Sequence, residues 1–458
     1  MLSDILKKAT IFCALTILTS SSSQSSQMPQ IPPVFQYGKN PHPLFQEALI
    51  SKGIDLSKVR NALEKKQYRR FRAYVSVGFG KNISIKTLSK LALEFQDSGL
   101  KKALRASQAL SALSGTALSK KEALLLSLFI ENELPLYVAK KRHYIRSKSA
   151  NLPRTVEHDP KTKLNFIHLG TNKLREIGRG YQKIVTKSIL YDVKRPEVVA
   201  NCKTSSGISR EVMLMREMKG TQGLVETRAF TKHRSNHKTF TSIFCRLYNQ
   251  GSLQLVMDKK LKFTLKEKVG MALNIMKGLS SLHKHKIIHR DLGARNYFVN
   301  IDKRKNGKRK VEAVVADLGR SYHFKGIKRD SSPQGNKYYF SSEMFFPEKM
   351  RPKDYTYSDL YATGCVFYRL LREKKAPWID IRTNRNEHLS RSERSRRALH
   401  RLEHHTNSRR HYLRSKGNKL SHSQIFEKVI YQMIHPEPKS RGTAREHART
   451  LQRLYNKL

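Results

Sequence analysis

The chain contains 458 residues, of which 38% are hydrophobic and 9% aromatic, so it can form a packed core and is not wholly disordered. It has no apolar run of about 18 residues, which excludes a protein built from membrane-spanning helices. Its formal net charge of +54 attracts nucleic acid, anionic lipid or acidic protein. Because the basic excess is spread along the whole chain, a general basic bias without a specific partner is an equal alternative. The cysteines lie too far apart for a zinc-binding pair or a disulfide-rich scaffold: Cys13, Cys202, Cys245 and Cys365.

The first 27 residues have the layout of a signal or export leader. A basic start is followed by the apolar run Ala9–Leu18 and a Ser-rich stretch. Asp4 and the lack of a clear A-x-A cleavage site weaken this prediction, and the alternatives are a buried first helix or a disordered leader that another export machine reads. A Pro-containing linker is predicted over 28–40. The leader predicts a secreted or exported protein, and the alternative is a cytoplasmic one.

Residues 41–150 are predicted to form a helical extension whose role the sequence does not reveal. Leu100–Leu113 and Lys120–Val138 carry apolar residues at three- and four-residue spacing. Ser119 is the expected N-cap of the second helix, and its leucines are expected to face a core. The basic segment Lys140–Arg154 is expected to be a linker.

Chemistry-bearing motifs begin near residue 165. Ile177-Gly178-Arg179-Gly180, followed by Val185, has the glycine spacing of a loop whose backbone approaches phosphate. A hairpin turn is the plainer interpretation. Lys183 stands at the third glycine position, where its ammonium could contact phosphate. The apolar strand Val198–Lys203 then ends in a lysine, which needs a carboxylate partner if it is buried, and Glu211 opens the next helical run. The alternative is an ordinary surface lysine and a glutamate that favours the start of a helix.

Two later strings are more specific. In His289-Arg290-Asp291-Leu292-Gly293-Ala294-Arg295-Asn296, an aspartate and an asparagine lie five residues apart on a tight loop. Val314–Gly319 is a buried strand that delivers Asp317 to a glycine turn. Two oxygen ligands from separate segments, Asn296 and Asp317, suit Mg²⁺, which prefers carboxylates and phosphate oxygens.

From about Leu164 to Leu458 the chain resembles a eukaryotic-type protein kinase, with the landmarks in the family's order. The His289–Asn296 string is similar to the catalytic loop, and Asp317-Leu318-Gly319 to the metal-binding DFG segment. Further segments resemble the stretch ending in APE, the start of the central C-lobe helix, the P-W after it and the late arginine motif: 335–343, 358–365, 376–378 and 438–444. The resemblance implies an α+β, bilobal fold over 160–458. Its β-rich N-lobe would span 165–250 and its helical C-lobe 251–458, behind the N-terminal helical extension.

The resemblance also implies a role for each matched residue in transfer of the ATP γ-phosphoryl group to a hydroxyl. ATP would contact Ile177, Gly178, Gly180, Val185, Lys203, Arg246 and Tyr248. Glu211 would hold Lys203 as a phosphate clamp, although Lys194 is an alternative clamp. Asn296 and Asp317 would hold Mg²⁺, and Asp291 would accept the proton of the attacking hydroxyl. Four residues would support the site: Arg290 as an anchor for a phosphorylated activation segment, Asp359, and Glu343 paired with Arg441.

Departures from the family leave the type of hydroxyl open. Gly293 stands where Ser/Thr kinases carry a lysine, and Arg295 stands where tyrosine kinases carry an arginine that could supply the missing cation. The stretch 335–343 looks more Ser/Thr-like, so tyrosine or dual specificity is only slightly favoured. The candidate phosphosites of the activation segment are Ser331, Ser332, Tyr338 and Tyr339, although Tyr339 is expected to pack.

Two basic segments interrupt the kinase-like region. Residues 381–420 contain 12 Lys or Arg, 3 acidic residues and five histidines. They are expected to form a solvated helical insert, and the alternative is a docking surface for acidic proteins or nucleic acid. Lys303–Lys310 contains Asn306-Gly307, which predicts an exposed hairpin.

The leading prediction is an ATP- and Mg²⁺-dependent kinase that phosphorylates Ser, Thr or Tyr hydroxyls of proteins. A small-molecule kinase is disfavoured because the activation segment and its arginine are both present. The main alternative is a catalytically weak pseudokinase or scaffold that recruits acidic partners or nucleic acid through its basic surface. A third is a nucleic-acid-associated protein that carries a kinase fold. If the leader is real, a secreted effector acting inside a host cell is the coherent expectation.

Overall fold

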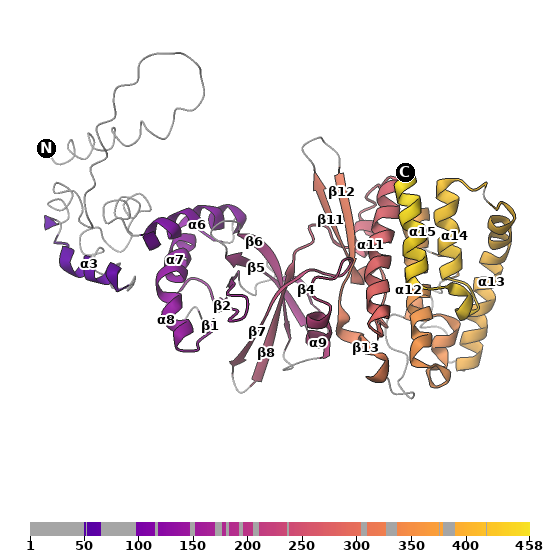
Figure 1. Ribbon diagram of the computed structural model, residues 1–458, viewed down its shortest axis with the longest axis horizontal. Helices are drawn as coiled ribbons and strands as arrows, with labels where there is room; N and C mark the ends of the chain where they lie inside the picture. Colours follow the sequence, from indigo (N-terminus) through magenta and orange to yellow (C-terminus); the bar gives the residue numbers. More distant parts are fainter. Residues whose placement is uncertain are drawn as a thin grey trace, which may run out of the picture.

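The computed structural model describes residues 50–51, 53–65, 98–114, 118–146, 152–169, 176–179, 183–191, 196–204, 210–235, 238–303, 309–326, 337–374, 376–378, 390–417 and 419–458. The expected leader and the linker after it lie outside these residues. Figure 1 shows an N-terminal helical part, a central sheet and a helical C-terminal part in sequence order along the longest axis. The predicted bilobal α+β fold is confirmed.

The described residues of the helical extension form α3 (Leu56–Glu64), α6 (Ser98–Ser114), α7 (Lys120–Leu128) and α8 (Leu134–Ala139), with a π-helical turn at Phe129–Glu133. Ser119 caps α7 as predicted, because its hydroxyl accepts from the Glu122 amide while the Glu122 carboxylate accepts from the Ser119 amide.

One antiparallel sheet forms the N-lobe. Its main strand order is β1-β2-β3-β5-β6-β8-β7, and β4 also pairs with β5. The strands are β1 (Tyr144–Ile145), β2 (Val156–His158), β3 (Asn165–His168), β4 (Glu176–Arg179), β5 (Lys183–Tyr191), β6 (Glu197–Thr204), β7 (Thr227–Ser235) and β8 (Lys238–Arg246). Helix α9 (Arg210–Glu217) follows β6, where the sequence predicted a helix opening at Glu211.

The extension and the N-lobe sheet share a core. Phe129 and Leu134 of the extension are buried in the same cluster as Ile167 of β3 and Ile189 of β5. The segment expected to be a linker, Lys140–Arg154, contains β1, which pairs with β2 at the edge of the sheet. The boundary expected at residues 150–160 therefore falls inside one continuous sheet.

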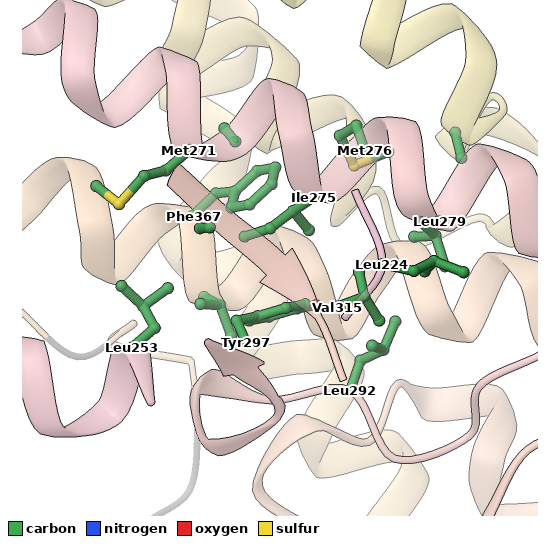
Figure 2. Packing of buried hydrophobic residues seen from close by; sticks show 14 of the residues in the cluster. Leu224, Leu253, Met271, Ile275, Met276, Leu279, Leu292, Tyr297, Val315 and Phe367 are labelled. Atoms are coloured by element: carbon green, nitrogen blue, oxygen red, sulfur yellow. The ribbon is translucent and has the colours of Figure 1, made fainter. Parts of the chain in front are cut away.

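The C-lobe is helical and surrounds α11 (Leu265–Lys284). Its other helices are α10 (Leu253–Asp258), α12 (Tyr355–Arg372), α13 (Arg391–Ser415), α14 (His422–Met433) and α15 (Ala444–Lys457). Figure 2 shows Met271, Ile275 and Leu279 of α11 facing a common core with Leu292 and Val315. Because Leu292 belongs to the catalytic-loop string and Val315 lies just before Asp317, this core fixes both segments.

Short strands complete the C-lobe: β9 (Gly251–Ser252), β10 (Ile287–Ile288), β11 (Tyr297–Lys303), β12 (Arg309–Val315) and β13 (Tyr322–His323). β11 and β12 pair as predicted for a hairpin, with Lys303 opposite Arg309, and the predicted turn lies outside the described residues. No helix among the described residues is long and apolar enough to cross a membrane.

Candidate active site

Helix α12 holds the catalytic-loop string in place through the side chain of Asp359. The carboxylate of Asp359 accepts hydrogen bonds from the backbone amides of His289 (2.9 Å) and Arg290 (3.0 Å). The ring of His289 is fully buried, and its Nε2 lies 2.9 Å from the carbonyl oxygen of Ala316. One buried aspartate and one buried histidine thus join the loop to α12 and to the segment before Asp317.

Asp291, Asn296 and Asp317 come together at one edge of the C-lobe. The Asn296 side-chain amide donates to the Asp291 carbonyl at 2.6 Å, and the Ala316 amide donates to the Asn296 carbonyl at 2.9 Å. Asp317 has the left-handed backbone angles φ 63° and ψ 73°, which are unfavourable for a residue with a side chain and favour a functional interpretation. Its carboxylate accepts from the Gly319 amide at 3.2 Å.

The donor set fits Mg²⁺ in part. The Asn296 amide nitrogen is committed to Asp291, so its oxygen is the atom suited to a hard cation, and Asp317 supplies a carboxylate. Two protein oxygens leave the remaining positions to water and phosphate, which is how Mg²⁺ is usually bound.

Asp291 has a basic neighbour that the sequence analysis missed. The Arg320 Nε lies 3.5 Å from the Asp291 Oδ2. Arg320 directly follows Asp317-Leu318-Gly319, and its side chain is half exposed. A partly exposed pair of this kind is weak and exchanges readily with other partners.

Arg290 is buried, and no carboxylate of the described residues forms an ion pair with its guanidinium, although the negative charge of Asp359 acts on it. Its relative exposure is 6%, and its φ of 67° is left-handed. Within the described ranges, its Nε and Nη2 atoms have no hydrogen-bond partner. The guanidinium lies 5.0 Å from the Tyr322 ring and 5.5 Å from the Tyr355 ring, and burial lowers the pKa of Arg290. This side chain has donors ready for an anion such as a phosphate.

The end of the activation segment is tied to the late arginine. Arg441 is fully buried, and its guanidinium donates to both carboxylate oxygens of Glu343, at 2.5 and 3.1 Å. Burial alone would raise the pKa of Glu343, but the charge and hydrogen bonds of Arg441 outweigh it and hold that pKa below its ordinary value. The two residues that the sequence analysis paired thus form a bidentate contact across 98 positions.

Tyr339 packs on the catalytic loop. A Cβ at Gly293 would lie 2.9 Å from the Tyr339 ring, so the ring uses the space that a side chain at 293 would need. Arg295 is exposed, and its positive charge acts on the Tyr339 hydroxyl. Tyr338 is also exposed, whereas Ser331 and Ser332 lie outside the described residues.

The expected nucleotide contacts come from β4, β5 and the end of β8. Ile177 is exposed on β4, and Gly178 lies opposite Val185 of β5. Gly180 lies outside the described residues. Arg246 ends β8, and its guanidinium bonds Glu312 of β12 at 3.1 Å. The buried Tyr248 hydroxyl accepts from the Glu226 amide at 3.2 Å.

The alternation of β6 separates Cys202 from Lys203. In the strand register Cys202 lies opposite Val185 and Ile243, whereas Lys203 lies opposite Ser242. Directly opposed residues share a face, and successive residues face opposite sides. Cys202 packs into the core cluster that includes residues of α9 and of the C-lobe, so it lies on the face of the sheet that is turned toward the C-lobe, here called the cleft side.

Lys203 is on the other side of the sheet, which corrects the expected clamp. Its ammonium lies 4.6 Å from the centre of the Phe240 ring and 5.7 Å from that of Tyr144, a residue of β1. Burial lowers the pKa of Lys203, and the negative charge that opposes this is that of Glu157. The structure therefore brings Lys203 to Glu157 and not to Glu211.

Cys202 and Cys245 occupy the inner face at the back of the expected nucleotide site. Their thiols contact each other, and this hydrogen bond together with burial raises the pKa of Cys245 well above its ordinary value. The negative charge of Glu211 raises that pKa further, so Glu211 acts on the same face. A sequence signal existed: in V-A-I-K the lysine lies two residues after the alanine, and here Cys202 lies two after Ala200.

The chain belongs to the protein kinase family, because the sequence profile of the protein kinase domain matches residues 172–451, more than half of the chain. It is 24% identical over 264 residues to the insulin receptor of Xenopus laevis, a match that covers 53% of this chain and 18% of the receptor. It is 30% identical over 139 residues to tyrosine-protein kinase FRK of Homo sapiens, covering 30% of this chain and 26% of that protein. It is 24% identical over 240 residues to calcium-dependent protein kinase 24 of Arabidopsis thaliana, covering 49% and 38%. The chain thus spans well under half of each of these relatives.

Proposed function

We propose that this protein transfers the γ-phosphoryl group of ATP to a hydroxyl group of a protein substrate, with Mg²⁺. The observation that carries the proposal is the convergence of Asp291, Asn296 and Asp317 on one edge, anchored by Asp359. Family membership supports phosphotransfer to proteins in general.

Each residue of the site has a role in this reaction. Asp291 orients the attacking hydroxyl and accepts its proton. Asn296 and Asp317 would hold the metal through oxygen atoms. When bound, ATP would supply the phosphoryl group, and Mg²⁺ would neutralise negative charge on the phosphates. Arg290 offers its buried donors to a phosphate on the activation segment, which would fix that segment beside the loop.

The hydroxyl specificity belongs to this proposal as well. Arg295 is exposed beside Tyr339, and a tyrosine kinase of this family carries an arginine at the matching position. We propose tyrosine or dual specificity on this basis. The matched relatives are named as tyrosine kinases and as serine/threonine kinases, so they support either outcome.

A second candidate is a catalytically weak scaffold, and one observation favours it. Cys202 faces the cleft where the family's clamp lysine would be, so β6 delivers no cation to the phosphates. A kinase fold without a lysine at this position can still bind protein partners, while its rate of phosphoryl transfer is reduced.

The test is radiolabelled phosphoryl transfer from ATP by the full chain with Mg²⁺, to itself and to generic proteins, followed by phosphoamino-acid analysis. Asp291→Asn and Asp317→Ala are expected to reduce transfer at least about 10²-fold, because they remove the proton acceptor and a metal ligand. Asp258→Asn, which changes an exposed aspartate on α10, is the matched control and should retain activity. Absence of transfer and of Mg²⁺-ATP binding in the wild type would favour the scaffold.

A further inference from the structure

A cavity of about 240 Å³ lies in the C-lobe where α13, α14 and the 3₁₀ turn Pro438–Arg441 meet. One wall of the cavity is α13, which belongs to the basic insert that was expected to be a solvated helix. The lining residues are Arg410, Leu413, Arg414, Lys428, Tyr431, Gln432, His435 and Ser440.

The lining is basic, and none of these described residues is acidic. Arg410 and Arg414 lie one turn apart on α13, Lys428 comes from α14, and His435 follows α14. Like charges at four-residue spacing on a helix destabilise it, so this arrangement is not explained by the stability of α13.

The neighbouring buried carboxylate is already neutralised by other arginines. Glu427 of α14 is 2% exposed, and Arg409 donates to its two oxygens at 3.0 and 2.6 Å. Arg372 of α12 also bonds Glu427. Arg409 therefore attaches α13 to the lobe. The negative charge that acts on the next arginine, Arg410, is that of Glu403, which is not among the residues that line the cavity.

Arg410 contrasts with Arg409 although the two are adjacent in sequence. Its Nη2 donates to Asn407, while its Nη1 is buried and has no hydrogen-bond partner in the described part of the chain. Burial and the nearby Arg414 lower the pKa of Arg410. A partly buried guanidinium that is repelled by a second one and has an unbonded Nη1 gains from an incoming anion.

His435 adds an imidazole ring to the lining. Its Nδ1 lies 3.1 Å from the Glu437 amide nitrogen and 3.3 Å from the Glu437 carbonyl oxygen. Burial and Arg410 lower the pKa of His435, which favours the neutral ring. Ser440 contributes a hydroxyl to the same cavity.

The volume of the cavity and its apolar lining residues limit the class of ligand that it can bind. A volume of about 240 Å³ is below the range of about 300–1,000 Å³ typical of whole small-molecule ligands, so it suits one phosphate group and the side chain that carries it. Leu413 and Tyr431 provide apolar surface for that side chain. Nucleic acid would instead be expected to use an extended basic surface that follows a backbone.

We propose that this pocket binds a phosphorylated side chain of a protein partner and so docks a protein that another kinase, or this one, has already phosphorylated. Its role as a substrate-docking site rests on the proposed function, whereas the binding itself does not. The pocket also adjoins the activation-segment anchor, because the Arg441 Nε donates to the His435 carbonyl at 2.7 Å. Phosphoserine, phosphothreonine and phosphotyrosine present the same phosphate monoester.

The experiment is fluorescence anisotropy with the full chain, without ATP, so that loss of catalysis cannot affect the readout. The probes are four peptide pools with randomised flanks, containing one central phosphotyrosine, phosphothreonine, phosphoserine or unmodified serine. Arg410→Ala and Lys428→Ala change the pocket from two helices, and circular dichroism confirms that each folds. Arg396→Ala, an exposed arginine of α13 outside the pocket, removes the same charge as a matched control.

At least one phosphorylated pool is expected to bind better than the unmodified pool. Arg410→Ala and Lys428→Ala should each weaken that binding about 10-fold, as expected for loss of a charge-assisted contact, and Arg396→Ala less than about 2-fold. The proposal fails if the unmodified pool binds equally well, or if Arg396→Ala weakens binding as much as the pocket variants. It also fails if the phosphopeptides do not bind while single-stranded RNA or phosphatidylserine vesicles bind in a pocket-dependent manner.

Discussion

At the scale of single residues, the position of one lysine decides how the phosphates of ATP would be held. Lys203 faces Phe240 and Tyr144 on the outer side of the sheet, and Cys202 faces the cleft. A cation for the phosphates must therefore come from another segment. Lys183 begins β5, opposite Thr204 and two residues before Val185, and its side chain lies outside the described part of the structure.

We expect Lys203→Met to change the affinity for Mg²⁺-ATP less than about 3-fold, and Lys183→Met to weaken it at least about 10-fold, which corresponds to about 1.4 kcal/mol. The reason is that the strand register places position 183 at the glycine-loop end of the face that carries Val185 and Cys202, whereas Lys203 is on the opposite face. Titration of the full chain with a fluorescent ATP analogue and Mg²⁺ measures this. Lys187→Met, an exposed lysine on the same strand, is the control. A large loss in Lys203→Met with an unchanged melting temperature would restore the original clamp assignment.

The pair of Glu343 and Arg441 is a second residue-scale determinant. Both side chains are largely removed from water, and Arg441 also donates to the Tyr357 and Pro436 carbonyls. Removing one member of such a pair leaves the other charge buried, which is far more costly than losing an exposed contact.

Arg441→Ala is expected to lower the free energy of unfolding by about 3–5 kcal/mol at neutral pH. In the folded state the pKa of Glu343 is below its ordinary value of 4.5. The ionised carboxylate therefore contributes fully to the free energy of unfolding above about pH 4.5, and this contribution is lost as the pH falls toward the folded pKa. The difference between wild type and variant should therefore narrow below about pH 4.5. Urea unfolding at several pH values tests this. Arg309→Ala, which removes a more exposed bidentate pair with Glu267, should cost about 1 kcal/mol or less.

At the scale of elements, β2 is fastened to the kinase sheet by a buried polar cluster. Glu157 of β2 is 1% exposed, lies 2.8 Å from the His168 ring and accepts from Ser242 at 3.2 Å and from Thr231. Burial alone would raise the pKa of Glu157, but the hydrogen bonds of His168, His233 and Thr231 hold it well below its ordinary range. One carboxylate thus joins β2 to three other strands, β3, β7 and β8, on the face opposite the cleft.

Glu157→Gln should lower the free energy of unfolding by about 2–3 kcal/mol, because neutral glutamine cannot satisfy the same donors and leaves nearby positive charge buried. Glu197→Gln, a similarly conservative change at a half-exposed residue paired with Arg228, is expected to cost less than about 1 kcal/mol. Urea unfolding of the two variants beside wild type gives the comparison. Equal effects would show that the cluster does not fasten β2.

The elements also show what the sequence could and could not predict. The catalytic-loop string, Asp317 and the partner of Glu343 were predictable because motif type and order encode contacts over long separations. The strands β1 and β2 have two and three residues, too few for a periodic signal, and their apolar partners lie far along the chain. Lys203 was misassigned because its residue type was weighed above its strand position: it lies three residues after Ala200, so the alternation of β6 places the two on opposite faces.

At the scale of the whole molecule, the helical extension and the kinase domain form one folding unit around the N-lobe sheet. Extension residues Leu126, Phe129 and Leu134 are almost completely buried against the sheet's edge. On the sheet, Ile167 and Ile189 depend on them for cover. Fully burying one large apolar side chain contributes about 1.5–3 kcal/mol, so losing several approaches the whole stability of a typical domain, about 5–15 kcal/mol.

A fragment of residues 160–458, which matches the family region but lacks the extension, is therefore expected to aggregate or to melt at least about 10 °C below the full chain. The physical cause is exposure of the apolar edge together with loss of β1, β2 and the carboxylate of Glu157. A fragment of residues 98–458, which keeps α6 and everything after it, should melt close to the full chain. Size-exclusion chromatography and thermal unfolding measure both fragments, and binding of a dye to exposed apolar surface reports the cause directly. If 160–458 were monomeric with an unchanged melting temperature, the extension would be a separate domain, and the fragment alone would suffice for the phosphotransfer assay.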